Sequence, residues 1–333
     1  MKIYTLIQTI KANSGSVWNG REICADTTRD KVLWGDAGQE CTGIISTCYA
    51  SPAVIKKAME LGCNFIVVHE ALFWNHGDRT DWLEKNTAFR KKKALLEESG
   101  VCIWRYHDYV HAGIRVDGAL HDGIFYGLSS LLGWNEYQTD KNALLCHDFC
   151  LPRAWTVQEM ASFLTKKFHL EGVRFIGNPA AKIRKVQVPM HILGHLSDDR
   201  IIEQINEEDI NCLLTLEMVD FTVCEYIRDA AMLGEDRCIF AVGHFNIEEI
   251  GMEYLAAAAA GTTSAGPLCA IRRCLPVSAL YLILIFMVER AHCRDIKPIF
   301  LGEQVKEISS WQTINKLLNR CLRQWAARQM SAA

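Results

Sequence analysis

Short apolar runs alternate along the chain with amphipathic stretches, and this alternation predicts buried strands separated by helices. In the first half, helices are expected from Pro52 to Leu61, where Ser51 supplies an N-cap, and over residues 85–99. The neighbouring strands are continuously apolar, which favours a parallel sheet covered on both faces. They span residues 43–48, 64–68 and 101–106. Right-handed crossovers would bring the carboxyl ends of these strands to one edge of the sheet.

The same pattern resumes after Pro152 and predicts a second unit. We expect strands over residues 173–176, 184–190, 210–215 and 237–242, and helices over residues 156–169, 199–206, 221–233 and 245–255. The sequence therefore predicts an α/β protein with two lobes, formed by residues 1–150 and 151–255.

An atypical C-terminal segment, residues 256–333, follows the two lobes. Its apolar run over residues 279–288 would make about 15 Å of helix, whereas a membrane span needs roughly 30 Å. We therefore expect no membrane partner. Residues 311–330 have the spacing of an amphipathic helix.

Composition narrows the classes of function. The formal net charge is −3, so there is no overall basic field and no direct signal for nucleic-acid binding. None of the fourteen cysteines lies in a Cys-x-x-Cys pair, and residues 1–11 do not resemble a secretory leader, so a cytoplasmic protein with unpaired thiols is expected. The sequence holds no phosphate-loop or Gly-x-Ser-x-Gly motif, which disfavours phosphate-loop nucleotide binding and serine-hydrolase chemistry.

Imidazoles and carboxylates gather where the predicted strands end. His69 and Glu70 follow the strand over residues 64–68, and His111 lies just beyond the next strand. His244 and Glu248 follow a third strand with an i, i+4 spacing, which places them on one face of a helix. These are the side chains that divalent metals need, at the sheet edge where α/β proteins build their sites. The pattern indicates a dinuclear metal centre.

These segments resemble the Nif-three-like proteins, also described as homologues of GTP cyclohydrolase one type two, over most of residues 1–255. The marks are a strand ending in a His pair, a later His-x-x-x-Asp segment, and Gly-His-x-x-x-Glu-x-x-Gly, which is intact from Gly243 to Gly251. Thr215-Leu216-Glu217 resembles the family's Thr-Gly-Glu. Two positions depart from the pattern, because the His pair is His69-Glu70 and the expected carboxylate is His111. The total of three imidazoles and two carboxylates is nevertheless kept.

The resemblance implies two Nif-three-like α/β lobes with a dinuclear metal site in the cleft between them. Two divalent metal ions, Zn, Mn or Fe, would be held by His69, Glu70, His111, His244 and Glu248, with Glu248 as the bridging carboxylate and catalytic candidate. We expect a metal-dependent hydrolase that acts on a small, nucleotide-like or heterocyclic substrate. The alternative is a non-catalytic metal-binding protein that regulates or binds protein partners. A homo-oligomer is implied as well.

Four other polar residues lie near these positions in the sequence. His107 is either a group that orients a ligand or a hydrogen-bonded core histidine, and both interpretations stay open. Glu217 either lines the site or places a negative charge before a helix. Asp108 and Glu249 are expected to face solvent.

Overall fold

The computed structural model describes residues 1–139, 147–189, 191–194 and 198–259. The predicted run over residues 279–288, the predicted helix over residues 311–330 and nearly all of the C-terminal segment lie outside these residues. The division of the chain at residues 150 and 255 stays a prediction.

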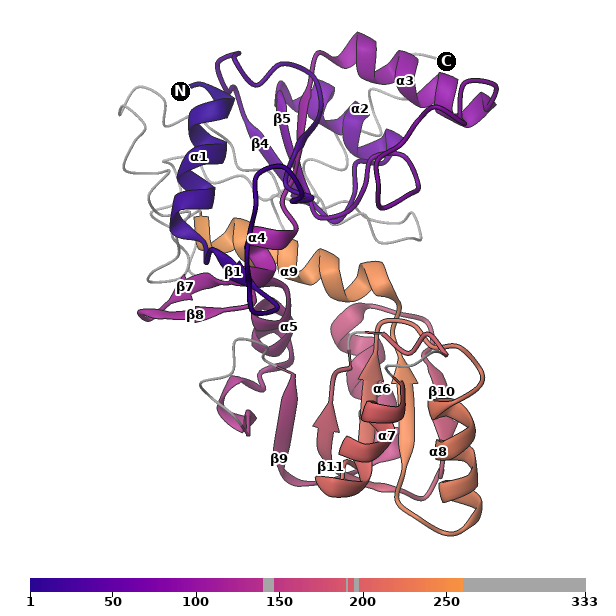
Figure 1. Cartoon of the computed structure of the whole chain (residues 1–333). Helices are drawn as coiled ribbons and strands as arrows, with labels where there is room; N and C mark the ends of the chain where they lie inside the picture. Colours follow the sequence, from indigo (N-terminus) through magenta and orange to yellow (C-terminus); the bar gives the residue numbers. More distant parts are fainter. Residues whose placement is uncertain (140–146, 190, 195–197, 260–333) are drawn as a thin grey trace, which may run out of the picture. The chain divides into compact units, whose positions relative to one another are not determined.

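The first sheet contains the three predicted parallel strands (Figure 1). Strands β4 (Ile44–Thr47), β5 (Phe65–Val68) and β6 (Cys102–Arg105) are parallel, and β3 (Val32–Trp34) joins β6 antiparallel, in the order β3-β6-β5-β4. The crossovers are α2 (Pro52–Leu61) and α3 (Thr87–Ser99). As predicted, the Ser51 hydroxyl caps α2 by accepting from the Val54 N–H at 3.2 Å, and Gly62 ends it in a left-handed conformation.

Alternate residues of β5 face two different cores, as the two-residue period of a strand requires. Ile66 and Val68 belong to the cluster formed with α2 and α3. Phe65 and Val67 belong to the cluster that contains the apolar face of α1 (Ile3–Asn13). The sheet is therefore covered on both faces, and the polar residues that follow β5 and β6 come at its carboxyl edge.

The second sheet has the order β10-β13-β12-β11-β9. Its parallel centre consists of β11 (Lys182–Gln187), β12 (Cys212–Thr215) and β13 (Cys238–Ala241), and its antiparallel edges are β10 (Arg174–Gly177) and β9 (Asp148–Thr156). The helices α6 (Val157–Phe168), α7 (Asp198–Glu207) and α8 (Val223–Met232) accompany it. All four strands predicted here are confirmed, whereas β9 was not predicted. Because β9 contains Pro152, its place at the edge of the sheet is the one that proline tolerates.

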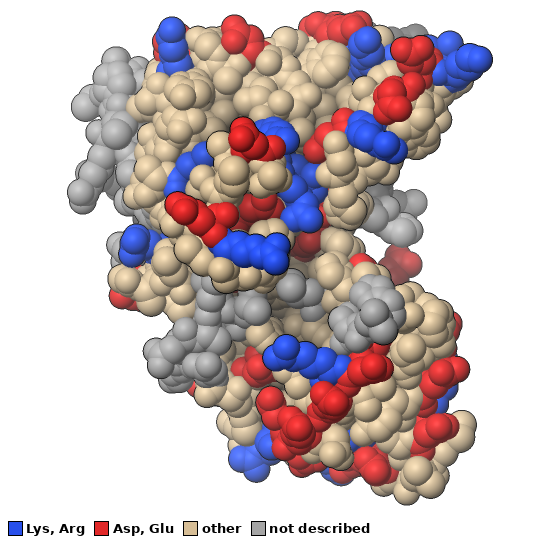
Figure 2. Space-filling view, viewed as in Figure 1, with Lys and Arg blue, Asp and Glu red and all other residues tan. Residues whose placement is uncertain are grey.

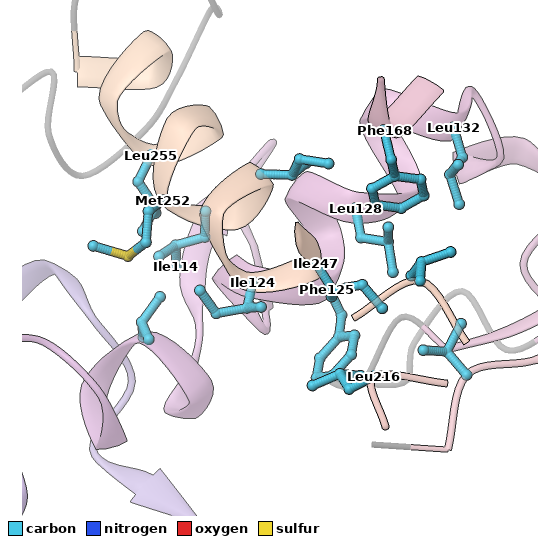
Figure 3. Packing of buried hydrophobic residues seen from close by; sticks show 14 of the residues in the cluster. Ile114, Ile124, Phe125, Leu128, Leu132, Phe168, Leu216, Ile247, Met252 and Leu255 are labelled. Carbon is cyan, nitrogen blue, oxygen red and sulfur yellow. The ribbon is translucent and has the colours of Figure 1, made fainter. Parts of the chain in front are cut away.

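Helix α9 (His244–Ala259) follows β13 and packs against α5 (Gly123–Leu132). Helix α5 was not predicted from the sequence. Two glycines allow the close approach: a Cβ on Gly251 would lie 2.6 Å from the Ile124 Cα, and one on Gly127 would lie 2.8 Å from the Gly251 Cα. Figure 3 shows the buried side chains around this crossing, including Leu128 and Ile247. Ser46 of β4 also donates to the Met252 carbonyl at 2.9 Å. Helix α9 is thus bound to both α5 and β4.

Smaller elements complete the described part of the chain. Helix α4 (Asp108–Ala112) follows β6, and two hairpins, β1–β2 (Val17–Trp18 with Arg21–Glu22) and β7–β8 (Ile114–Val116 with Ala119–His121), lie before and after it in sequence. A short 3₁₀ turn, η1, spans Asn135–Tyr137. Acidic and basic side chains are interspersed on the face drawn in Figure 2. Among the described residues, no helix is long and apolar enough to cross a membrane and no cysteine forms a disulfide.

Candidate metal centre

His69 lies directly after β5, and its ring is fully buried. The Nδ1 atom is 3.2 Å from the Tyr106 carbonyl oxygen, which can only accept, so Nδ1 carries the proton and donates. Nε2 is left as the basic nitrogen. It is buried, has no hydrogen-bond partner within the described residues, and lies 3.5 Å from Glu248 Oε1. A buried lone pair without a donor is the observation expected at a metal ligand.

Two more imidazoles meet His69 at the start of α4. The His69 ring stacks on that of His107 with centroids 4.5 Å apart, and the His111 centroid is 5.0 Å from each of them. One ring nitrogen from each of the three lies within 4.8 Å of the others. His107 Nδ1 is 3.0 Å from Asp108 Oδ1, and His111 Nδ1 is 2.7 Å from Asp122 Oδ2. His107, which the sequence left open, therefore belongs to the cluster.

Burial and the neighbouring imidazole of His69 lower the pKa of His107 to about 2, so that its ring is neutral. Burial also opposes the charged form of His111, but the carboxylate of Asp122 outweighs it and raises the pKa of His111. The pKa values of these two neighbouring rings are thus shifted in opposite directions.

The expectation that Asp108 faces solvent is wrong. Its carboxylate is buried and accepts from the Thr28 hydroxyl at 3.0 Å, from the Arg29 N–H at 2.9 Å and from the Arg29 side chain at 3.1 Å. Burial alone would raise the pKa of Asp108, but the hydrogen bonds from His107, Arg29 and Thr28 hold it below its ordinary value. Asp30 accepts from the backbone N–H groups of His107 and Asp108 at 3.0 and 2.7 Å. These contacts fix the start of α4.

Glu248 and His244 lie on the first turn and a half of α9. His244 Nε2 is 2.7 Å from Glu248 Oε1 and 3.9 Å from Glu70 Oε1, while its Nδ1 is 2.7 Å from Glu217 Oε2. Burial opposes the charge on His244, yet Glu217 and Glu248 raise its pKa to about 10. Without a metal ion, a proton thus occupies the nitrogen that faces Glu248.

Glu217 lines the site, which decides between its two interpretations. Its second oxygen is 2.8 Å from Nδ1 of His191, a half-exposed residue that the sequence analysis did not single out. Burial raises the pKa of Glu217, but the hydrogen bonds from His191 and His244 lower it to about 2. The available signal for His191 was its position directly after the predicted strand over residues 184–190.

The expectation that Glu249 faces solvent is also wrong. Glu249 is buried and accepts from the Thr47 hydroxyl at 3.0 Å and from the backbone N–H of Cys48. The Cys48 thiol donates to Glu248 Oε2 at 3.3 Å. Both acidic residues are therefore held by the residues at the carboxyl end of β4, roughly two hundred positions earlier in the chain.

Within the described residues, three groups of side chains could hold a metal ion, each with its donor atoms within 4.8 Å of one another, and the first two groups share His69. They are His69, His107 and His111; His69, Glu70 and Glu248; and His191, Glu217 and His244. All five residues proposed from the sequence fall in these groups. The donor set of buried imidazoles and carboxylates, with an unpartnered His69 nitrogen among them, fits divalent cations.

The fold is similar to that of several solved structures. A hypothetical protein from Staphylococcus aureus is 16% identical with a TM-score of 0.58, and covers 82% of this chain and 93% of its own. A Bacillus cereus protein related to NIF3 is 14% identical with the same TM-score, and covers 90% of this chain and 99% of its own. Reduced HcgD from Methanocaldococcus jannaschii is 16% identical with a TM-score of 0.51, and covers 78% of this chain and 94% of its own.

No curated protein matches the sequence. The sequence model of one family, Duf34/NIF3 (NGG1p interacting factor 3), matches residues 31–266, which is most of the chain and includes every residue of the three groups. The resemblance seen in the sequence is thus confirmed, and the chain belongs to the Duf34/NIF3 family.

Proposed function

We propose that this protein is a metal-dependent hydrolase with a dinuclear centre held by His69, Glu70, His111, His244 and Glu248. One observation carries the proposal. Each imidazole in the cluster has its Nδ1 on an oxygen atom that can only accept: the Tyr106 carbonyl, Asp108, Asp122 and Glu217 are the partners of His69, His107, His111 and His244. In each of the four rings Nε2 is then the nitrogen that could bind a metal ion, which in His244 would replace the proton that faces Glu248. Such an Nδ1 contact is the usual support for a metal-ligating histidine.

Glu248 is the best candidate for a carboxylate shared by both ions. Its Oε1 atom is 2.7 Å from His244 Nε2 and 3.5 Å from His69 Nε2, so it lies between imidazoles of different groups. The Cys48 thiol holds its other oxygen. Bound divalent ions would lower the pKa of a water molecule and stabilise negative charge on a substrate oxygen.

An aromatic surface next to His244 supports a heterocyclic substrate. Phe245 is 50% exposed, stacks on Tyr49 with centroids 5.2 Å apart, and has its ring centre 6.0 Å from that of His244. A planar ring that stacks on the exposed part of Phe245 would lie beside the proposed centre, since aromatic rings favour offset stacking at such distances.

The test is removal and restoration of metal. The full chain is stripped with a chelator, reloaded separately with Zn, Mn, Fe or Co, and assayed against nucleotide-like and heterocyclic amides and esters. We expect two metal equivalents per chain and a return of turnover. Glu248→Gln should abolish turnover, whereas the exposed Glu171→Gln should retain it. Full metal content without turnover on any substrate would reject the enzyme.

An exposed aromatic residue beside the site favours a second candidate, a metal-binding protein that acts through a protein partner. Phe245 is 50% exposed, and its ring centre lies 6.0 Å from that of His244. His244→Ala separates the two functions. Loss of turnover with an unchanged circular dichroism spectrum favours catalysis, whereas unchanged turnover with loss of partner binding favours the second candidate.

A further inference from the structure

The candidate ligands divide into two sets of different chemistry. His69 can serve only one ion, because its Nδ1 is engaged with the Tyr106 carbonyl. It lies with two other imidazoles, and we call His69, His107 and His111 the imidazole subsite. The Oε1 atoms of Glu70 and Glu248 lie 3.9 and 2.7 Å from His244 Nε2. We call Glu70, Glu248 and His244 the carboxylate subsite.

Arg105 determines how Glu70 faces the carboxylate subsite. The guanidinium is fully buried, and its Nη2 donates to Glu70 Oε2 at 3.0 Å. Its Nε donates to the His69 carbonyl at 3.0 Å. Its Nη1 lies 3.2 Å from the His76 carbonyl and 3.3 Å from Asp78 Oδ2. Three nitrogens with four acceptors leave the side chain no freedom to turn.

Arg105 contacts only one of the two carboxylate oxygens of Glu70. Oε2 also accepts from the Ala71 N–H at 3.2 Å, whereas Oε1 is the atom directed at His244. The ion pair with Arg105 gives the buried Glu70 carboxylate a charged hydrogen-bond donor on Oε2. Arg105 therefore fixes the orientation of Glu70 and leaves Oε1 as the oxygen that faces the subsite.

The two subsites differ in the donors that they offer. Glu70 places a carboxylate in one subsite, and His111 places an imidazole in the other. Imidazole ligands suit Zn²⁺, while carboxylate ligands suit Mn²⁺ and Mg²⁺.

We propose that Arg105 holds Glu70 as a one-oxygen ligand and that the centre is consequently a mixed one, with Zn²⁺ in the imidazole subsite and Mn²⁺ in the carboxylate subsite. The inference rests on the dinuclear centre proposed above but not on hydrolysis. Zn²⁺ binds most sites more tightly than Mn²⁺, so excess Zn²⁺ would fill both subsites. The difference in metal preference between the two subsites is therefore observed only when Zn²⁺ is limiting.

The experiment supplies the stripped full chain with one equivalent of Zn²⁺ and an excess of Mn²⁺, followed by removal of free metal. Elemental analysis and the electron paramagnetic resonance spectrum of Mn²⁺ are the readouts. We expect one Zn and one Mn per chain. Glu70→His should lower Mn²⁺ affinity at least about tenfold, and Arg105→Lys should do the same because it loses the planar fork. Glu97→His and Arg90→Lys are the matched controls on the exposed face of α3 and should leave the metal content unchanged.

The outcomes separate the two proposals. Equal Zn-to-Mn ratios in the unaltered chain and in Glu70→His would overturn the mixed centre, and Glu70→His decides the matter even where Arg105→Lys does not fold. A mixed centre without turnover would support this inference while rejecting the hydrolase. Binding of neither metal would overturn both.

Discussion

Gly251 is the position at which a single methyl group should disturb both the fold and the candidate centre. In Gly251→Ala, the new Cβ would lie 2.6 Å from the Cα of Ile124 in α5 and 3.0 Å from its carbonyl oxygen. Ordinary contacts begin at about 3.4 Å, so α5 and α9 would have to separate by about 0.8 Å. The obstacle is backbone, which cannot rotate away as a side chain would.

The expected cost follows from two opposing effects. Alanine in place of glycine favours the helix by about 1 kcal/mol, whereas overpacking costs about 1–3 kcal/mol, and a clash with backbone belongs at the upper end. We therefore expect a net destabilisation of about 2 kcal/mol, or about 4–8 °C in Tm. Because Glu248 lies one turn before Gly251, metal affinity should fall as well.

Urea unfolding followed by circular dichroism, with metal content measured on the same samples, tests this expectation. Gly172→Ala is the control, since a Cβ there would meet no atom within 4 Å. A Gly251→Ala variant as stable as the unaltered chain, with full metal content, would refute the argument that close approach of α5 and α9 positions the ligands.

Three further predictions follow from single contacts. Asp122→Asn keeps an oxygen to cap α5 but loses the carboxylate that contacts His111 Nδ1. Metal affinity measured by calorimetry should therefore fall about 10–100-fold, with little change in the free energy of unfolding. An unchanged metal affinity would contradict the role of Asp122. Burial lowers the pKa of Lys92 to about 8 from 10.5, so the unfolded chain binds more protons than the folded chain between pH 8 and pH 10.5. The stability of the unaltered chain relative to Lys92→Met, measured by denaturant titration, should therefore rise by about 3 kcal/mol over that range. A stability difference that does not change with pH would show that Lys92 stays charged. Thr156→Ala removes the capping box of α6 and should cost about 1 kcal/mol of stability without changing metal content, and any loss of metal would be unexpected.

The sequence predicted those elements whose own residues carry the signal. Helix α2 has a Ser cap, a Pro at its first position and a terminal Gly, and β5 is an unbroken apolar run between them and His69. Helix α5 was missed because seven of its ten residues are buried, so its sequence lacks the polar face that marks an amphipathic helix. Pro152 hid β9, since proline inside a run ordinarily argues against a strand.

At the candidate site, the sequence indicated the candidate ligands but not the residues that support them. His69 and His244 follow recognisable strands, whereas the burial of Asp108 and Glu249 depends on partners 79 to 202 positions away. Arg105 lies within an apolar strand, where a charged residue carries no periodic signal. Such long-range pairings are set by tertiary packing, which local pattern does not contain.

Helix α9 contacts segments that are far apart in the chain, and this has a consequence for the abundance of the protein in a cell. Ions bound between β5 and α9 would act as removable cross-links, stabilising the native state by about 2.7 kcal/mol when free metal exceeds Kd a hundredfold. If metal became scarce, that contribution would disappear, and a larger fraction of molecules would become open to proteases. Abundance of the protein would then follow metal supply without any dedicated sensor.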